Sequence, residues 1–243
     1  MSSATHETHN QHISQQFNQN LSELRNHFLE MGGLVQRQIT DAVDALINSD
    51  TDLADSVNQT EKRVDDMERM IDEECTQIIA RRQPAASDLR LVLSTVKMIA
   101  DLERIGDEAD KIAKMAIRLS DDGKAPRGYI EVRHISKHVS QMVNGALDSF
   151  ARFDANMALD IIREDKTVDA EYGSAIRSLM TFMMEDPRSI SQVHNILWVL
   201  RALERIGDHA ANVAEHVIFM VNGTDVRHMK ITEAEQLVEE KNS

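Results

Sequence analysis

The residues best suited to chemistry in this sequence are acidic residues that occur in pairs, four positions apart. Glu103 and Asp107 form one such pair inside the hexapeptide Leu-Glu-Arg-Ile-Gly-Asp. The same hexapeptide recurs in the second half of the chain, where it contains Glu204 and Asp208. Residues four apart on an α-helix point within about 40° of each other. Each pair therefore places two carboxylates on one face of a helix, and the repeated hexapeptide indicates an internal duplication.

A further acid pair precedes each copy of the hexapeptide. Glu61 and Asp65 precede the first copy. Asp165 and Asp169 precede the second copy in matching surroundings. Consecutive helices of a bundle are antiparallel neighbours, so the two pairs of each half are expected to face each other. Four carboxylates at one place repel unless they are protonated or share a cation. The sequence therefore predicts one metal site in each half, built from Glu61, Asp65, Glu103 and Asp107 and from Asp165, Asp169, Glu204 and Asp208.

Carboxylate oxygens favour hard cations such as Mg²⁺, Ca²⁺, Mn²⁺ or iron over a thiolate-type zinc site. The alternative explanation is a solvated acidic face that arginine or lysine neutralises. Arg104 and Arg205 directly follow the glutamates and so point about 100° away from them, which leaves neutralisation within the helix incomplete. Four pairs at matching places favour the metal sites. Ala211 stands where the first repeat has Asp110, so the two sites need not be equivalent.

A carboxylate-metal enzyme, either a hydrolase or an oxidase, is the competing functional hypothesis. A ferritin-like di-metal oxidase uses two Glu-x-x-His motifs. Glu131 and His134 form the only such motif in this chain. The sequence also lacks a Gly-rich phosphate loop, a nucleophile elbow and a Cys/His pair. No catalytic residue is therefore predicted.

The elements that position these acids are predicted to be long amphipathic helices. Apolar residues recur in steps of three and four around both hexapeptides, with Ile105 and Ile206 in the two stripes. Pro84 and Pro187 interrupt this periodicity at equivalent places. The predicted fold class is all-α, with two tandem pseudo-symmetric three-helix bundles. The expected segments are a disordered polar tail (1–16), the first bundle (17–120), a linker (121–129), the second bundle (130–223) and a loose C-terminal tail (224–243).

Each predicted hexapeptide helix contains one glycine in its interior, Gly106 in the first and Gly207 in the second. Glycine in a helix interior costs about 1 kcal/mol relative to alanine. Because both repeats accept this cost, we expect another backbone to approach closely at each glycine.

The overall composition restricts the class of partner. Lys and Arg total 27 against 41 Asp and Glu, which gives a net charge of −14 and opposes binding to nucleic acid or to anionic lipid. Cys75 is the only cysteine, which excludes an internal disulfide and suits a reducing cytosol. No apolar run reaches the roughly 18 residues of a membrane span, and the polar N-terminus lacks a signal-peptide core. We therefore expect a cytoplasmic protein with no membrane span and no nucleic-acid partner.

From about Phe17 to His228 the chain resembles the PhoU family of bacterial phosphate-signalling regulators. The two Leu-Glu-Arg-Ile-Gly-Asp copies carry this resemblance most strongly. They are followed by Ala-Asp-Lys-Ile-Ala at 109–113 and by Ala-Asn-Val-Ala-Glu at 211–215. A doubled signature in the correct repeat phase is a specific match.

The resemblance implies two three-helix bundles and a regulatory role without enzymatic activity. It implies that the four acid pairs bind metal ions or clusters, with magnesium, manganese or iron as candidates. It further implies action at the inner face of the membrane through protein partners, namely the ATPase subunit of a phosphate ABC transporter and a sensor histidine kinase. Such a protein represses the phosphate-starvation response when phosphate is plentiful. A homodimer or higher assembly is also expected.

Overall fold

The computed structural model describes the backbone of residues 3–82 and 84–242 and the side chains of residues 15–81 and 84–239. Within these residues the chain forms seven α-helices, one short 3-10 helix and no β-strand. The predicted all-α class is therefore confirmed. The elements are α1 (Ser3–Asn48), α2 (Thr51–Arg82), α3 (Ala86–Asp122), α4 (Tyr129–Arg152), α5 (Ala155–Glu185), η1 (Pro187–Ser189), α6 (Ile190–Asn222) and α7 (Ile231–Asn242).

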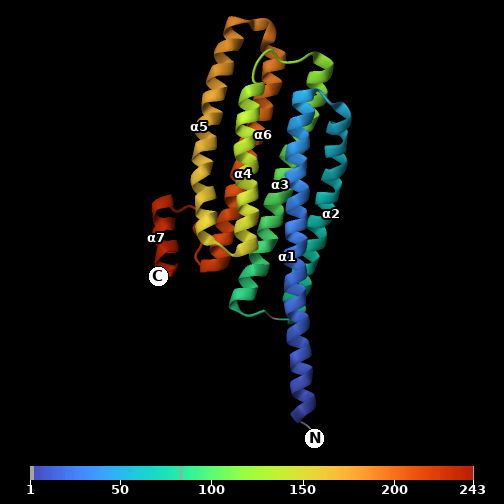
Figure 1. The fold of residues 1–243 in the computed structure, drawn as a ribbon, viewed down its shortest axis with the longest axis vertical. Helices are drawn as coiled ribbons and strands as arrows, with labels where there is room; N and C mark the ends of the chain where they lie inside the picture. Colours follow the sequence, from blue (N-terminus) through green and yellow to red (C-terminus); the bar gives the residue numbers. More distant parts are fainter. Residues whose placement is uncertain (1–2, 83, 243) are drawn as a thin grey trace.

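The two predicted three-helix bundles are present and lie side by side, α1 to α3 in one and α4 to α6 in the other (Figure 1). Their helices run along the long axis of the molecule. The most extensive contact between any two helices joins α3 to α6, and α1 also packs against α4. The buried apolar residues of both bundles consequently form one connected core. The two hexapeptide helices therefore lie against each other at the boundary between the bundles.

The apolar stripes predicted around the hexapeptides form this core. Ile105 and Ile206 are both completely buried, at matching places in α3 and α6. Leu102 and Leu203 are buried beside them. Burying a side chain of this size contributes about 1.5–3 kcal/mol. The rotation of each hexapeptide about its helix axis is thus set by its apolar residues, and the acids must lie off that stripe.

Matching aspartates begin the second helix of each bundle. The backbone N–H of Leu53 donates to Asp50 Oδ1 at 3.0 Å. Asp154 Oδ1 accepts from the backbone N–H groups of Asn156 and Met157, each at 3.0 Å. Such caps satisfy backbone donors that have no partner inside the helix and contribute about 1 kcal/mol each. They start α2 and α5 at equivalent places, which keeps the acid pairs of the two repeats in register.

Helices extend into both terminal segments of the chain. The first helix was expected to begin near Phe17, but α1 extends back to Ser3. The C-terminal segment contains α7, in which Ala234 and Val238 are buried. These two residues are four apart and pack on the core, and Arg163 Nη2 pairs with Glu235 Oε1 at 2.7 Å to join α5 to α7. Ile231 joins Ala234 and Val238 in this stripe, but three apolar positions over two turns give too weak a periodic signal to predict a helix.

None of the helices in the described part of the chain carries an apolar stretch that could cross a lipid bilayer. The break predicted between the bundles lies between Asp122, where α3 ends, and Tyr129, where α4 begins.

Candidate metal centres

The first acid cluster lies between α2, which carries Glu61 and Asp65, and α3, which carries Glu103 and Asp107. Burial raises the pKa of Glu61 from 4.5 to about 7, and repulsion from Asp107 and Asp65 adds to this rise. Gln38 Nε2 on α1 donates a hydrogen bond to Glu61 Oε2 at 2.6 Å, and this bond lowers the pKa of Glu61 and so offsets part of the rise. Burial also raises the pKa of Glu103, and repulsion from Asp107 is the next largest cause of this rise. The acids of α2 and α3 therefore face each other closely enough to repel.

The glycine of the first hexapeptide makes room for one of these carboxylates. A Cβ placed on Gly106 would lie 2.8 Å from Glu61 Oε2 and 3.1 Å from Gln38 Oε1. A Cβ on Gly207 would meet only ordinary contacts, with Val168 Cγ1 at 3.5 Å and Asp165 Oδ1 at 3.6 Å. The expected close approach of a backbone is therefore wrong at both positions. At Gly106 a side-chain carboxylate makes the close approach instead.

Arg104 is not directed away from the first acid pair as its position in the helix implied. Its Nε lies 3.4 Å from Glu103 Oε2 and its Nη1 lies 3.3 Å from Asp107 Oδ2. The long guanidinium side chain bends back over the helix surface, so the direction of its Cα–Cβ bond does not decide which acid it reaches. Arg104 is more than half exposed, so water screens both interactions.

The second acid cluster lies between α5 and α6. Asp169, Glu204 and Asp208 each offer an oxygen, and the three oxygens lie within 4.8 Å of one another. Asp165 is the fourth predicted ligand and is not part of this closest group. Burial raises the pKa of Asp165 from 3.8 to about 6, with repulsion from Asp208 next in size. Among the described residues, no three acids of the first cluster come as close as this group.

Three buried carboxylate oxygens in these clusters have no hydrogen-bond partner. They are Glu61 Oε1 and Asp110 Oδ1 in the first cluster and Glu204 Oε2 in the second. Leaving a buried acceptor unsatisfied costs about 1–3 kcal/mol, and more for a charged group. A bound cation would satisfy such oxygens and remove the repulsion between the acids. The residues present therefore fit a hard cation in each cluster.

Two positions outside the acid pairs make the clusters different, and sequence reasoning identified the one at Asp110 but missed the one at Gln38. Gln38 contacts Glu61, but in the register that aligns Glu61 with Asp165 its counterpart is Met142. Asp110 is buried and pairs with Lys114, whereas its counterpart Ala211 has no carboxylate. Glutamine in a neighbouring helix cannot be found from the spacing of acids. Only an alignment of the first helix of each repeat would have drawn attention to it.

The second cluster opens toward α7. Asp165 and Glu215 line a pocket of about 440 Å³ together with Met229 and Lys230, which precede α7. Burial raises the pKa of Glu215 as well. The C-terminal segment thus forms part of the wall around this cluster.

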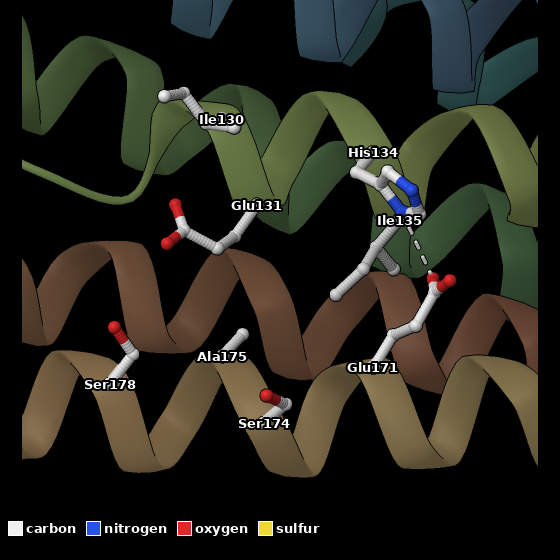
Figure 2. A pocket seen from close by; sticks show the side chains of 8 residues that line it. All are labelled: Ile130, Glu131, His134, Ile135, Glu171, Ser174, Ala175 and Ser178. Atoms are coloured by element: carbon white, nitrogen blue, oxygen red, sulfur yellow. Dashed lines mark hydrogen bonds and ion pairs between the residues drawn. The ribbon is translucent and has the colours of Figure 1, made fainter.

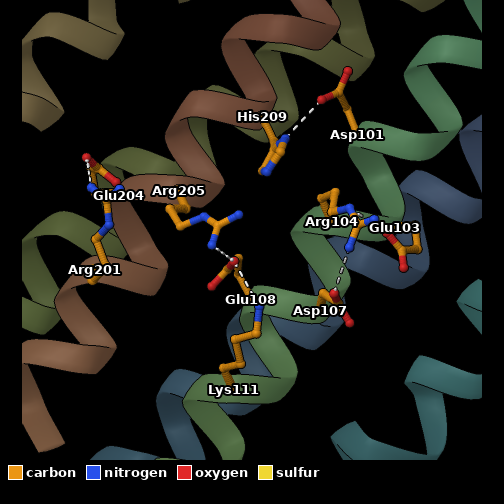
Figure 3. A network of polar contacts seen from close by, with 10 residues as sticks. All are labelled: Asp101, Glu103, Arg104, Asp107, Glu108, Lys111, Arg201, Glu204, Arg205 and His209. Carbon is orange, nitrogen blue, oxygen red and sulfur yellow. Dashed lines mark hydrogen bonds and ion pairs between the residues drawn. The ribbon is translucent and has the colours of Figure 1, made fainter.

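A polar network crosses between the bundles, from α6 to α3 (Figure 3). Arg205 Nη1 lies 3.1 Å from Glu108 Oε1, which also pairs with Lys111 Nζ at 3.0 Å. His209 Nδ1 lies 2.9 Å from Asp101 Oδ1. Arg205 therefore neutralises an acid of the other bundle, while the second cluster receives Arg201, whose Nη1 donates to Glu204 Oε1 at 2.5 Å. His209, next to Asp208 in sequence, belongs to this network.

The chain matches the model of the PhoU domain twice, over residues 28–116 and 132–217. A phosphate-specific transport system accessory protein PhoU homolog of Pseudomonas aeruginosa is 60% identical over 228 residues, which cover 94% of both chains. The accessory protein PhoU of Escherichia coli is 46% identical over 234 residues, covering 96% of this chain and 97% of its own.

Two crystal structures share the fold. PhoU from P. aeruginosa superimposes with a TM-score of 0.84 at 60% sequence identity, covering 86% of this chain and 100% of that one. The phosphate transport system regulatory protein PhoU from Streptococcus pneumoniae gives a TM-score of 0.80 at 28% identity, covering 86% and 99%.

Proposed function

The chain belongs to the PhoU family, and we propose that it is an accessory regulator of a phosphate-specific transport system. In this role it acts at the cytoplasmic face of the membrane and contacts the ATPase subunit of a phosphate ABC transporter. It also contacts a sensor histidine kinase and represses the phosphate-starvation response when phosphate is plentiful. It acts as a homodimer or larger assembly, through binding and without catalysis.

The observation that supports a metal-dependent regulator is the duplicated acid cluster with unsatisfied buried oxygens. Glu61 Oε1 and Glu204 Oε2 occupy the two bundles, on helices that face a second acid-bearing helix. A bound Mg²⁺, Mn²⁺ or iron ion would supply positive charge that cancels the repulsion among these acids. The residues that would hold it are Glu61, Asp65, Glu103 and Asp107 in the first bundle and Asp165, Asp169, Glu204 and Asp208 in the second.

The chain's own residues decide what such charge does to the fold. In each bundle the second helix and the hexapeptide helix carry acids that repel, so their separation depends on how that repulsion is relieved. The hexapeptide helices α3 and α6 also form the main contact between the bundles. A change in charge at either cluster therefore acts on a helix that packs against the other bundle, and this gives a regulator a route from an acid cluster to the rest of its surface.

The test is complementation in cells that lack their own copy of the protein. We expect the wild-type chain to keep a phosphate-starvation reporter low in phosphate-rich medium. We expect Asp107→Asn combined with Asp208→Asn to lose this repression, while Asp121→Asn, which removes an exposed acid at the end of α3, keeps it. Capture of the tagged chain at high and low phosphate should recover the transporter ATPase subunit and the kinase.

The results separate the possible explanations. A wild-type chain that leaves the reporter unchanged, and captures neither partner, would refute the regulatory role. A double variant that represses as well as the wild type would remove the metal sites from the mechanism but leave the regulator intact. Turnover of a phosphate ester, or oxygen consumption with Mn²⁺ or iron, that Asp208→Asn abolishes would establish the metal enzyme instead.

A further inference from the structure

A second kind of ligand set lies on the second bundle, between α4 and α5. Two histidines one helical turn apart on α4, His134 and His138, face Glu171 on α5. His134 Nδ1 and His138 Nδ1 lie 3.2 Å and 3.1 Å from the same atom, Glu171 Oε2. One ligand atom from each of the three residues falls within 4.8 Å of the others. We propose that His134, His138 and Glu171 bind a divalent transition-metal ion of the zinc class.

The distances fit a shared ion. Ligand atoms bound to Zn²⁺ at about 2.0–2.1 Å in tetrahedral geometry lie about 3.3 Å apart. The two nitrogen-to-oxygen distances here are close to that edge length. Histidines four apart on a helix project from the same face and form a chelating pair, as in the helical zinc motif of metalloproteases. Nitrogen and carboxylate ligands select zinc-class ions over Mg²⁺, which prefers oxygen.

An unsatisfied nitrogen argues against a simple ion pair. His138 Nδ1 is shielded from solvent and has no hydrogen-bond partner, because its contact with Glu171 lacks hydrogen-bond geometry. A lone histidine–glutamate pair exists on the first bundle for comparison, where His27 Nδ1 lies 2.9 Å from Glu74 Oε2 and is hydrogen-bonded to it. The His134/His138/Glu171 cluster instead directs two imidazoles at one carboxylate oxygen, which a single shared ion would satisfy.

An ion could reach this cluster from solvent. A pocket of about 340 Å³ lies beside it, lined in part by Glu131, His134, Glu171 and Ser174 (Figure 2). His134 is well exposed on the pocket wall. Three protein ligands leave an open coordination position, as in zinc sites that bind water or a second ligand. Glu131 lies one turn before His134 on the same wall and offers a further carboxylate there.

The cluster is separate from the duplicated acid clusters. Glu171 follows Asp169 by two residues, so the two side chains leave α5 about 160° apart. The first bundle lacks it. In the register that aligns Glu61 with Asp165, the matching positions are occupied by Glu30, Leu34 and Met67. The site is therefore particular to the second bundle and does not depend on the proposed function.

The test uses the full chain with His6, His9 and His12 changed to glutamine, because imidazole is a general ligand for transition metals and would compete for the added ion. Co²⁺ is added in the presence of millimolar Mg²⁺, which occupies oxygen-only sites, and its visible d–d absorption is followed. We expect one equivalent of Co²⁺ to give the absorption band of a Co²⁺ ion with low coordination number, and we expect Zn²⁺ to remove this band by displacing the Co²⁺ ion. Zn²⁺ should also raise the melting temperature by mass action.

The variants assign the ligands. We expect His134→Gln with His138→Gln to abolish the band, and Glu171→Gln to weaken Co²⁺ binding by at least about tenfold. His27→Gln removes the histidine of the comparison pair and should leave the band unchanged. Each variant is checked for its melting temperature in chelator. Glu171→Gln alone decides the result where the double variant is destabilised. The proposal is overturned by absence of the band, or by Co²⁺ affinity that none of these three residues alters.

Discussion

Changing Glu61 to glutamine should stabilise the metal-free protein at mildly alkaline pH. Glu61 is surrounded by acids and by Gln38, and its Oε1 has no partner, as is also true of Gln38 Oε1. Both oxygens lie beside Gly106, 3.4 Å and 3.1 Å from the point where a Cβ would stand. A glutamine at position 61 can accept from Gln38 Nε2 and donate an N–H to Gln38 Oε1. It removes the buried charge and leaves the shape of the side chain unchanged.

The magnitude follows from the pKa of Glu61, which rises from 4.5 to about 7 on folding. A rise of this size corresponds to about 3 kcal/mol between the two protonation states. Glu61 is only partly buried, so solvent screening reduces the effect to about 1–2 kcal/mol. Because the folded protein holds the proton of Glu61 more tightly than the unfolded chain does, the contribution of Glu61 to stability is fully present below about pH 4.5. That contribution is lost as pH rises through 7.

The assay is thermal unfolding followed by circular dichroism, in chelator, at about pH 5 and about pH 8. For a chain of this length, 1–2 kcal/mol shifts the melting temperature by about 3–6 °C. We expect Glu61→Gln to raise the melting temperature by this amount at the higher pH and by much less at the lower. Glu73→Gln, which removes an exposed acid on the same helix, should change little at either pH. An equal or lower melting temperature for Glu61→Gln at alkaline pH would refute the reasoning.

Four further outcomes are expected. Mn²⁺ or Mg²⁺ at a hundredfold excess over its dissociation constant should stabilise the wild type in thermal unfolding by about 2.7 kcal/mol for each occupied cluster. The double variant Asp107→Asn with Asp208→Asn should lose most of this stabilisation by metal. If sodium chloride at the same ionic strength stabilised the wild type equally, that result would contradict the metal sites. Ile206→Asp should unfold the second bundle, because the side chain is fully buried, and retained helicity by circular dichroism would argue against this. The melting temperature of Gly106→Ala should lie below that of Gly207→Ala, because a methyl group at position 106 would meet Glu61 Oε2 at 2.8 Å and at position 207 would make only ordinary contacts. Light scattering should give a mass above that of the 27.5 kDa monomer at micromolar concentration.

The fold could be predicted because its signal is long and repeated. Three-four periodicity sustained over whole helices sets both their type and their buried face, and Ile105 and Ile206 lie where that pattern puts them. The contact between α3 and α6 was not predicted. A signal for it exists in α6, where Ala202, Leu203 and Ala211 are all buried although they point in different directions. A helix buried on more than one face must have neighbours on more than one side.

The sequence could predict only those parts of the site that depend on the spacing of residues within one helix. Acids four apart are visible in the sequence, as is the histidine pair His134 and His138. Which residue on the next helix meets them depends on how far one helix is shifted along the other, and that shift comes from core packing. Gln38 and Glu171 were missed for this reason. The course of a long arginine side chain is equally non-local, since Arg104 turns back to its own acids while Arg205 crosses to the other bundle.

The two acid clusters differ through individual side chains and not through the path of the backbone. Both lie between the second and third helix of a bundle, and matching aspartate caps start α2 and α5 in the same register. Replacing Gln38 by Met142 removes the hydrogen bond that Glu61, a partly buried residue of the first cluster, receives from Gln38. Replacing Asp110 by Ala211 removes a carboxylate. The ligands themselves also differ, because Asp165 stands where the first cluster has Glu61. A difference in cation affinity between the clusters is therefore expected to arise from individual side chains, such as those at these three positions and the arginines that neutralise each pair, because the helices that carry the ligands are duplicated.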